Sequence, residues 1–292
     1  MSKSGAVAVF GTFDGIHKGH RAVLSSALAF TELVPVAITF DVPPKRFMSN
    51  EFTPMLMTSD RKKALLGELG FKTIEVLDFE AIRDKSAEEF LDDMFQKFDI
   101  KVAVCGFNYR FGKNAEGNAE YLTSYCHRHG AEAVVCPGTS FSGQIISSTL
   151  IRNLIAEGQL SFANTLLESR FSFVSEVVHG EERGRTLGFP TVNQQLDSNL
   201  VVPKYGVYAT AVTVDGMKYP AVTNIGLRPT FLLKKPISET YIIGFEGDLY
   251  GKKLEVELID YIREEMRFVS VDQFKSTLSS DCEKALKLFG DV

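Results

Sequence analysis

The sequence predicts an α/β domain with a parallel sheet, at residues 1–169, followed by a small antiparallel β-barrel with a terminal helix, at residues 170–292. Three observations lead to this prediction. The chain of 292 residues is long enough for two ordinary hydrophobic cores. In the first half, short apolar runs alternate with segments of helical periodicity, as in β-α-β units. In the second half, strand-like runs follow one another until a single helical segment ends the chain.

The expected strands of the first half are short apolar or β-rich runs, at residues 6–10, 33–40, 73–77, 101–105 and 133–136. The segments between them have helical composition or apolar residues at helical spacing, at residues 21–30, 61–69, 86–98 and 120–129. Ser86 and Glu89 form a capping box at the start of the third helix. Ligands of parallel sheets bind beyond the carboxyl ends of the strands, so the loops there are the expected place of a site.

The strands expected in the second half are residues 171–178, 205–214, 217–224, 240–245 and 254–262. The last of them alternates apolar and polar residues from Leu254 to Leu258, as a half-buried strand does. The turn-forming pairs Asp215-Gly216 and Gly247-Asp248 separate neighbouring runs. Ser270 and Gln273 are expected to cap the final helix. Its expected buried face consists of Phe274, Leu278, Ala285 and Leu286.

Composition restricts the partners and the location of the chain. Its 32 Lys+Arg and 37 Asp+Glu residues give a net charge of −5 without a long basic run, so we expect no nucleic acid as a partner. No apolar stretch approaches the ~18 residues of a membrane span, and the first apolar run is too short for a signal peptide, so no membrane is expected. The four cysteines are scattered without a CxxC pair, which is typical of reduced thiols in a cytoplasmic protein.

The first group of chemistry-bearing residues lies in residues 11–20, between an expected strand and an expected helix. Glycines permit a tight turn there, and the free N–H groups at the start of the helix suit a phosphate. His17 and His20 lie three residues apart, so their imidazoles share one face and can donate hydrogen bonds to phosphate oxygens. Exposed turn residues or a pair of metal ligands are the alternatives. The coincidence of a glycine-rich turn, a helix start and paired histidines favours phosphate.

A second loop, residues 180–193, is rich in glycine, positive charge and small polar side chains, and can wrap around a phosphate. Thr191 and Asn193 are two residues apart, so their oxygens fall on one side of an extended chain. Such oxygens suit a hard cation such as Mg²⁺. A plain glycine-rich hairpin explains the spacing equally well. The chain has no GxxxxGK[ST] motif, so this site is not a P-loop.

Longer motifs connect both regions to a known family. Residues 17–20, His-Lys-Gly-His, resemble the HxGH motif of nucleotidylyltransferases, and residues 146–152 resemble their later Ser-Ser-Thr-x-Ile-Arg motif. Residues 106–112 resemble a third segment, found in the bacterial bifunctional riboflavin kinases/FAD synthetases. Residues 184–193 resemble the Gly-Arg-x-Leu-Gly-Phe-Pro-Thr-x-Asn element of riboflavin kinase. Further segments of that kinase are matched by residues 224–230, 239–241, 247–251 and 263–264.

The resemblance covers nearly the whole chain and implies two activities. The first domain, of the nucleotidylyltransferase (Rossmann-like) fold, would transfer the adenylyl group of ATP to FMN, which produces FAD and pyrophosphate. The second, a flavokinase-like barrel, would phosphorylate riboflavin to FMN with ATP and Mg²⁺. Riboflavin, FMN, FAD and ATP are then the expected ligands, as substrates or products.

In the first domain, the resemblance implies that His17, His20 and Arg152 act on the phosphates of ATP during catalysis. The serine and threonine residues at 147–149 would cap the next helix and add phosphate contacts. The residues that the motifs place around ATP are Gly11, Phe13, Asp14, His17, Gly19, His20, Asn108, Ser147, Ser148, Thr149 and Arg152.

In the second domain, the resemblance implies that Glu239 takes the proton of the riboflavin 5′-hydroxyl as the γ-phosphoryl group moves. Thr191 and Asn193 would hold the Mg²⁺ that accompanies the nucleotide. Residues 224–230 are expected to form a flap over the flavin. The residues expected around ATP are Gly180, Arg185, Gly188, Pro190, Thr191 and Asn193, and those around the flavin are Asn224, Arg228, Glu239 and Arg263.

Three positions depart from the family pattern. The segment after the second strand reads Pro43-Pro44 where the family has a histidine, Leu150 stands at a position that is often basic, and Tyr241 replaces a histidine. One alternative is therefore a riboflavin kinase with a degenerate first domain, and another is a first domain that adenylates a different phosphorylated compound. A non-catalytic flavin-binding regulator is an alternative of another class, but sensing does not need both sets of reactive residues.

Overall fold

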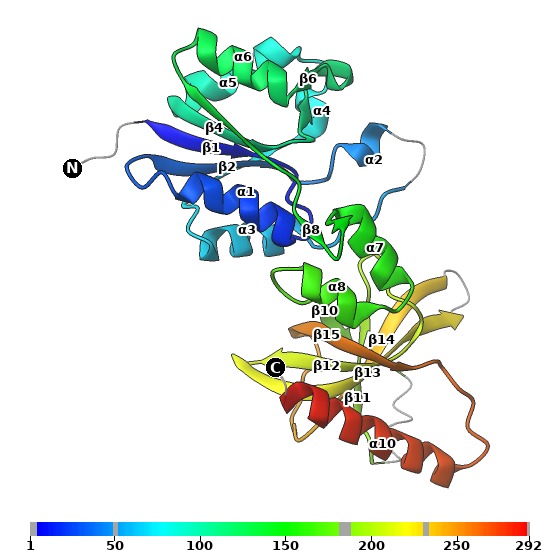
Figure 1. The fold of residues 1–292 in the computed structure, drawn as a ribbon. Helices are drawn as coiled ribbons and strands as arrows, with labels where there is room; N and C mark the ends of the chain where they lie inside the picture. The colour runs from blue at the N-terminus through cyan, green and yellow to red at the C-terminus, as the bar shows by residue number, and fades with distance from the viewer. Residues whose placement is uncertain (1–4, 49–51, 181–187, 230–233, 291–292) are drawn as a thin grey trace. The chain divides into compact units, whose positions relative to one another are not determined.

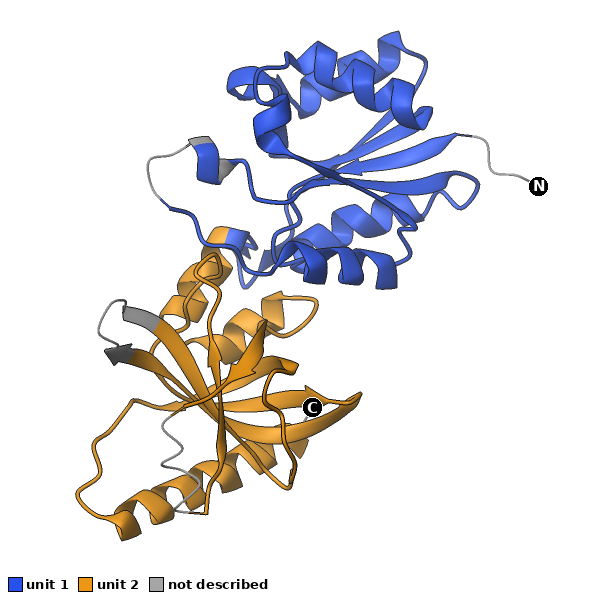
Figure 2. Cartoon of the chain, turned by 180° about the vertical axis from the view of Figure 1, so that it is seen from behind, with its two compact units in different colours: residues 1–148 blue, residues 149–292 orange. Residues whose placement is uncertain are grey.

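The computed structural model describes residues 5–48, 52–180, 188–229 and 234–290 (Figure 1). The chain divides into two compact units, Met1–Ser148 and Thr149–Val292 (Figure 2). The change of sequence pattern, near residue 170, comes later than this division. Helices α7 (Ser148–Ala156) and α8 (Leu160–Leu166) lie between the two points. The barrel holds α8 directly, because Asn164 Nδ2 donates to the backbone oxygens of Leu258 and Ile259, at 2.9 and 3.1 Å.

The first unit is built on a five-stranded sheet with the order β3-β2-β1-β4-β7. Its strands are β1 (Ala6–Phe10), β2 (Val34–Phe40), β3 (Thr73–Leu77), β4 (Ile100–Gly106) and β7 (Glu132–Cys136). All neighbouring strands are parallel, which confirms the predicted class. The strand order reverses between β1 and β4. Doubly wound sheets bind ligands at this point, beyond the carboxyl ends of the strands.

Helices cover both faces of this sheet. Helices α1 (Lys18–Leu28) and α3 (Ser59–Glu68) lie on one face, and α5 (Ala87–Phe98) and α6 (Ala119–Arg128) lie on the other (Figure 1). The predicted capping box is present at α5, where Glu89 Oε2 accepts from Ser86 N at 2.8 Å. The connections contain α2 (Lys45–Met48), α4 (Phe79–Ile82), the 3-10 turn η1 (Lys113–Ala115), and the antiparallel pairs β5 (Arg110–Phe111) with β6 (Gly117–Asn118) and β8 (Ser140–Phe141) with β9 (Gln144–Ile145).

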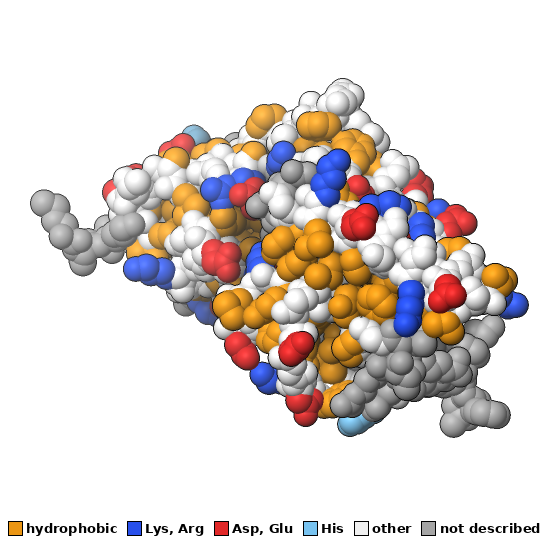
Figure 3. Space-filling view, turned by 90° about the horizontal axis from the view of Figure 1, so that it is seen from below, with side chains coloured by type: hydrophobic (Ala, Val, Ile, Leu, Met, Phe, Trp, Pro, Cys, Tyr) orange, Lys and Arg blue, Asp and Glu red, His pale blue; other side chains and the backbone are white. Residues whose placement is uncertain are grey.

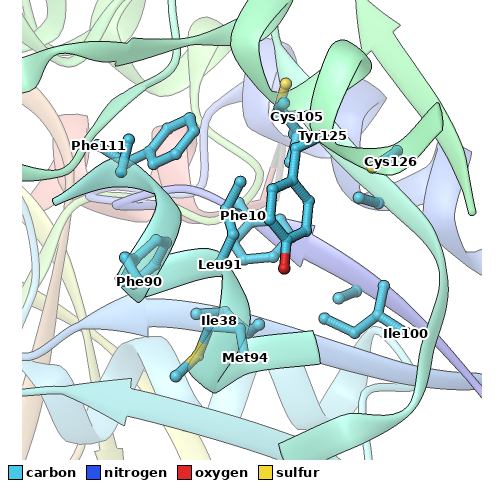
Figure 4. Packing of buried hydrophobic residues seen from close by; sticks show 14 of the residues in the cluster. Phe10, Ile38, Phe90, Leu91, Met94, Ile100, Cys105, Phe111, Tyr125 and Cys126 are labelled. Atoms are coloured by element: carbon cyan, nitrogen blue, oxygen red, sulfur yellow. The ribbon is translucent and has the colours of Figure 1, made fainter. Parts of the chain in front are cut away.

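Strand β1 is apolar throughout because both of its faces are buried. Phe10 belongs to the cluster formed with α5 and α6, where it lies near Leu91 and Tyr125 (Figure 4). The preceding residue, Val9, belongs to the other cluster, together with Leu24 of α1. Successive strand residues alternate between the two faces, so a strand that is covered on both sides reads as a continuous apolar run.

The second unit is a closed barrel with the strand order β10-β11-β14-β13-β12-β15. All of its pairings are antiparallel, and helix α10 (Val271–Gly290) ends the fold, which confirms the predicted architecture. The strands are β10 (Ser172–Val178), β11 (Thr191–Gln195), β12 (Gly206–Val214), β13 (Met217–Pro229), β14 (Lys234–Ile242) and β15 (Lys253–Arg263).

The barrel wall has an inner face that includes buried polar residues and an outer face that α10 partly covers. Val222 packs with Ala285 of α10, so this side of β13 is the outer one. Its neighbour Thr223 therefore faces inward, where its hydroxyl bonds with those of Thr210 and Thr240, at 2.8 and 2.9 Å. All three threonines are fully buried. Residues two positions from Val222 on the same strand, such as Asn224, lie on the outer face.

Two predicted elements of the barrel are wrong in part. Residues 224–229 are not a loop, because they continue β13 and pair with β14, up to Pro229 opposite Lys234; Thr230 lies outside the described residues. Their role as a flap over the flavin stays a prediction. Strand β14 ends at Ile242 instead of residue 245, because a turn follows in which Gly244 adopts a φ of 74°.

The predicted buried face of the last helix is correct except at Leu286. That residue is 47% exposed, whereas Ala285 is fully buried. The face toward the barrel runs through Leu278, Cys282, Ala285 and Phe289, which are three or four residues apart. Leu286 lies about 100° around the helix from Ala285, so it falls outside this stripe.

The surface carries charges of both signs. On the face shown in Figure 3, Lys and Arg side chains are interspersed with Asp and Glu around an area of hydrophobic side chains. Large apolar residues are exposed on the strands of the second unit, for example Val174, Val178 and Met217. Within the described ranges, no helix has the length and apolar character needed to cross a membrane.

Candidate functional site

The two histidines of the first candidate site form a stacked pair at the start of α1. His17 is the N-cap, and its Nδ1 accepts a hydrogen bond from the backbone N of His20 at 3.2 Å. The two rings stack with centroids 3.7 Å apart and an interplanar angle of 16°. Because the His17 Nδ1 is an acceptor, the proton of the neutral ring is on Nε2, which can donate to an oxygen. The predicted shared face of the pair is confirmed.

The glycines of this loop make room for side chains of the chain itself. A Cβ atom at Gly19 would stand 3.0 Å from Cε1 and Nδ1 of the His17 ring. At Gly11, a Cβ atom would stand 2.7 Å from the Phe13 ring, which is buried and meets His20 edge-on at 5.5 Å. The motif therefore needs glycine to seat its own aromatic rings, a requirement that is separate from any approach of a phosphate.

The loop before α1 is strained and firmly anchored. Phe13 and Ile16 adopt positive φ angles of 47° and 35°, which are unfavourable for residues with side chains and are concentrated at functional sites. Asp14 is buried, and its Oδ1 accepts from Leu56 N at 2.9 Å. Its backbone oxygen accepts from Ser148 Oγ, also at 2.9 Å. This last bond joins the HxGH loop to the first residue of α7, so two distant motifs meet.

The other predicted residues of this site lie at the ends of two further elements. Asn108 is exposed and follows β4, whose last residues pair with the end of β1 next to the HxGH loop. Ser147 precedes α7 and is half-buried. Thr149 and Arg152 lie on α7, beyond the division between the units, with Thr149 exposed and Arg152 half-buried. The Ser148 hydroxyl donates to Asp14 and not to its own helix.

A buried lysine beside the histidine pair escaped the sequence analysis. Lys62 of α3 is 3% exposed, and its Nζ donates to the backbone oxygens of Thr12, at 3.2 Å, and of Phe40. Burial lowers the pKa of Lys62 to about 8. The pKa of His20 is lowered well below its usual value, mainly by burial of its ring and further by His17 and Lys62, so the ring is neutral at pH 7. A signal existed in the sequence: Lys62 shares a helical face with Leu65 and Leu66.

The second candidate site is a row of polar residues across three strands of the barrel. Glu239 of β14 pairs directly with Asn193 of β11 on one side and with Asn224 of β13 on the other. Directly paired residues on antiparallel strands share a face, with Cβ atoms ~5 Å apart. Thr191 lies on the same face, opposite Tyr241, so the predicted one-sided arrangement of Thr191 and Asn193 is confirmed.

The side chain of Asn193 is held tightly and carries an unused acceptor. Asn193 is 8% exposed, and its Oδ1 is buried without a hydrogen-bond donor among the described residues. Gly180 lies against it, because a Cβ atom there would stand 2.3 Å from Asn193 Nδ2. A buried carbonyl oxygen without a donor costs stability unless something else binds it. A cation is a suitable partner for such an oxygen.

Glu265 is a second residue that the sequence analysis did not single out. Its Oε1 accepts from Asn224 Nδ2 at 3.1 Å. A Cβ atom at Gly226 would stand 2.3 Å from the same Oε1, so the carboxylate lies directly over β13. Asn224 Oδ1 is buried and has no donor within the described part of the chain. The polar row thus continues from Asn224 to the carboxylate of Glu265, which lies on the segment between β15 and α10.

Three predicted arginines have different outcomes. Arg263 donates from Nε and Nη2 to Asp281 of α10, at 3.0 and 2.8 Å, and from Nη1 to the backbone oxygen of Glu264. Its guanidinium therefore holds the end of β15 to α10, and the expected contact of Arg263 with flavin stays a prediction. The backbone of Arg228 lies on β13 opposite Lys235, and Arg185 lies outside the described residues.

Breaking this ion pair is expected to destabilise the second unit. Asp281 is 1% exposed, so an Asp281→Ala substitution leaves the Arg263 guanidinium without its partner and should cost about 3 kcal/mol. Denaturant unfolding, compared with the exposed-residue control Glu283→Ala, measures this cost. Equal stability of the two variants would show that the pair does not anchor the helix.

A cavity of about 570 Å³ lies next to the polar row, within the second unit. Pro190 and Thr191, both predicted around ATP, line it from the start of β11. The turn after β14 lines the other side, including Asp248 and Tyr250, and the Tyr250 ring stacks on His179 with centroids 3.8 Å apart. The volume is in the range of small-molecule sites. The remaining predicted residue, Gly188, is exposed, with a φ of 89°.

Comparisons with known proteins agree with this division into two sites. The family model described as FAD synthetase matches residues 1–150, and the one described as riboflavin kinase matches residues 167–289. A bifunctional riboflavin kinase/FMN adenylyltransferase of Listeria monocytogenes is 33% identical, over 98% of this chain and 93% of that protein. One of Pseudomonas fluorescens is also 33% identical, over 97% of this chain and 93% of that protein.

One solved structure is similar to this chain over most of its length. It is titled a macrolide-efflux protein from Streptococcus pneumoniae, and it matches 97% of this chain and 94% of its own, at 32% identity and a TM-score of 0.88. That title differs from the names of the curated relatives, which contain the same two activities as the two family models. The chain therefore belongs to the family of bifunctional riboflavin kinases/FMN adenylyltransferases.

Proposed function

We propose that the chain carries out both reactions of its family, each with one of the two sets of residues described above. The first unit adenylates FMN to FAD around His17 and His20. The second unit phosphorylates riboflavin to FMN around Glu239. The observation that carries the proposal is the placement of Glu239 between Asn193 and Asn224, because a base and oxygen ligands then meet on one face beside a cavity.

Adenylyl transfer needs charge stabilisation and positioning more than proton transfer. A phosphate oxygen of FMN attacks the α-phosphorus of ATP, the bond to the β-phosphate oxygen breaks, and pyrophosphate leaves. The nucleophile is already anionic, so no general base is required. His17 donates from Nε2 to the ATP phosphates, and His20 shares the site through its stacked ring. The bond from the Ser148 hydroxyl to the backbone oxygen of Asp14 ties the last residue of the first unit to this loop.

Residues that follow β1 and β4 support the proposal that ATP binds beside the histidine pair. Asn108 follows β4, and the histidine pair follows β1, so both lie beyond the strand ends where the sheet order reverses. We retain Thr149 and Arg152 as further proposed phosphate contacts on α7. Gly11, Phe13, Asp14 and Gly19 act by shaping the loop: the glycines leave room for the rings of Phe13 and His17, and Asp14 accepts from Leu56 N.

Phosphorylation of riboflavin differs because its nucleophile is a neutral hydroxyl. Glu239 accepts the proton of the 5′-hydroxyl while that oxygen bonds to the γ-phosphorus and ADP leaves. Asn224 and Glu265 on the adjoining strand and segment provide polar contacts for the flavin end of the site. We place the nucleotide in the cavity lined by Pro190 and Thr191, next to Glu239.

The residues of β11 fit a magnesium ion that accompanies the nucleotide. Asn193 Oδ1 is buried without a donor in the described ranges, and the Thr191 hydroxyl lies on the same face of the strand. Amide and hydroxyl oxygens are hard ligands of the kind that Mg²⁺ accepts. Bound there, Mg²⁺ would neutralise charge on the phosphate oxygens. Thr191 and Asn193 would hold the ion with their side-chain oxygens, and Gly180 leaves the space that the Asn193 side chain occupies.

Replacing Asn193 by alanine is expected to raise the Mg²⁺ concentration needed for half-maximal FMN formation by at least about tenfold, roughly 1.4 kcal/mol. The reason is the loss of one oxygen ligand. Titration of Mg²⁺ during riboflavin phosphorylation measures it, with Gln195→Ala on the same strand as control and FAD formation from FMN as an internal reference. An unchanged Mg²⁺ requirement in Asn193→Ala would remove Asn193 from the metal site.

We place the enzyme in the cytoplasm, with riboflavin, FMN, FAD and ATP as its ligands and without a nucleic acid or membrane partner. The thiols support this location, because all four cysteines are free and Cys105, Cys126 and Cys136 are buried. A riboflavin kinase that has lost the first activity is the competing proposal, based on Pro43 and Leu150. Conversion of FMN to FAD by the purified protein decides between them.

A further inference from the structure

Lys62 occupies a position where lysine is rarely found. It lies on the face of α3 that also presents Leu65 and Leu66 to the core, and 3% of the residue is exposed. Lysine is almost never fully buried unless its ammonium is paired, because desolvation of a charge is costly. Its sequence neighbour Lys63 is exposed. The buried ammonium of Lys62 therefore needs hydrogen-bond or charged partners within the fold.

The Lys62 ammonium joins the carboxyl ends of two neighbouring parallel strands. Its Nζ donates to the backbone oxygen of Phe40, the last residue of β2, and to that of Thr12, at 3.2 Å, just beyond β1. The hydroxyl of Thr39 donates to the same Thr12 oxygen, at 2.9 Å. Thr12 begins the strained loop that leads to His17. The lysine is thus fixed beneath the segment that carries the histidine pair.

Charged groups face this ammonium from each neighbouring element. Asp14, in the loop after β1, and Asp41, directly after β2, interact favourably with it and raise its pKa. Burial has the larger, opposite effect, and Lys63 adds to it, so the pKa of Lys62 falls to about 8. His20 of α1 also lies within reach, because the Lys62 charge lowers the pKa of its imidazole. The charge therefore acts on the same residues that would meet the triphosphate.

We propose that Lys62 is a positioning residue for adenylyl transfer, whose ammonium ties the ends of β1 and β2 together and holds the His17–His20 loop ready for the ATP phosphates. This inference rests on the adenylyltransferase site proposed above. Lys62 touches backbone oxygens of Thr12 and Phe40, so it acts through the loop and through its charge. A preorganised loop with a fixed positive charge beneath it favours a polyanionic ligand.

The pH dependence of the unmodified enzyme gives a first test. Lys62 is charged below its pKa and becomes neutral as the pH rises through about 8. Because kcat/KM reports ionisations of the free enzyme, kcat/KM for ATP in FAD formation should fall about tenfold per pH unit above that value. FMN formation from riboflavin, measured on the same protein, should not show this fall.

Substitutions assign the titration to Lys62. In Lys62→Arg the guanidinium stays charged, so the fall above pH 8 should disappear. In Lys62→Met, of similar length without charge, kcat/KM for ATP at pH 7 should be lower by about a hundredfold and no longer fall above pH 8. Lys63→Met is the matched control and should behave like the unmodified enzyme. Near-ultraviolet circular dichroism and thermal unfolding verify that each variant is folded.

The outcomes distinguish a failure of the proposed role of Lys62 from a failure of the proposed adenylyltransferase function. A folded Lys62→Met enzyme with unchanged kcat/KM for ATP at pH 7, or an alkaline fall that persists in both Lys62 variants, overturns the role of Lys62 while FAD formation itself stands. An unmodified protein that neither binds ATP in the first unit nor forms FAD overturns the proposed function, and the role of Lys62 with it.

Discussion

Replacing His20 by alanine is expected to lower FAD formation from FMN by at least about a hundredfold, while riboflavin phosphorylation continues unchanged. His20 stacks on His17 at 3.7 Å and receives support from the Phe13 ring, so its removal takes away one imidazole and loosens the other. Both activities are measured on one protein by separating the flavins. The two sites belong to separate units, which is why one reaction serves as the reference for the other.

The control for this variant is Lys18→Ala, an exposed residue of the same motif. It should keep both activities, which would show that disturbance of the helix start alone is not the cause. Loss of both activities in a folded His20→Ala protein would contradict the assignment of the two reactions to two sites. Full FAD formation in that variant would remove His20 from the mechanism.

The second large effect is expected at Glu239. A Glu239→Gln substitution should lower FMN formation by about 10²–10⁴-fold, because the amide keeps the size of the side chain but cannot accept the hydroxyl proton. Conversion of supplied FMN to FAD should remain. The exposed-residue control, Glu176→Gln on β10, should retain both activities. If Glu239→Gln phosphorylated riboflavin at the normal rate, Glu239 would be a packing residue of β14 and the base would have to be sought elsewhere, beginning with Glu265.

The sequence predicted those elements whose local pattern agrees with their tertiary surroundings. Strand 6–10 was predicted with its observed bounds, because a strand buried on both faces is apolar throughout. The capping box of Ser86 and Glu89 depends only on neighbouring residues. Strand β11, with the sequence Thr-Val-Asn-Gln-Gln, was read as part of a loop, because its polar residues serve the site and it has no apolar run.

The residues of the candidate sites could be predicted from the sequence, but the contacts that these residues make could not. The motifs indicated His17, Glu239, Asn193 and Thr191, and the structure brings the last three onto one face through pairings that no local pattern specifies. The glycines were expected to admit a phosphate, but Gly19 seats the ring of His17. Such close approaches depend on side chains folding back, which spacing does not encode.

Two charged residues have tertiary partners that the sequence did not indicate. Arg263 was expected at the flavin, and its ion pair with Asp281, from a helix eighteen positions later, had no signal in the local sequence. Lys62 was not singled out, because burial of its ammonium depends on carbonyl groups of β2 and of the loop after β1. Both cases need the tertiary partner before the role of the residue can be stated.

The most direct test of the account is a product assay on the purified chain. The protein is incubated with ATP, Mg²⁺ and either riboflavin or FMN, and the flavins are separated by chromatography. We expect FMN from riboflavin and FAD from FMN, in the same preparation. FMN without FAD would contradict the adenylyltransferase assignment of the first unit, and no product from either flavin would contradict the enzymatic account as a whole.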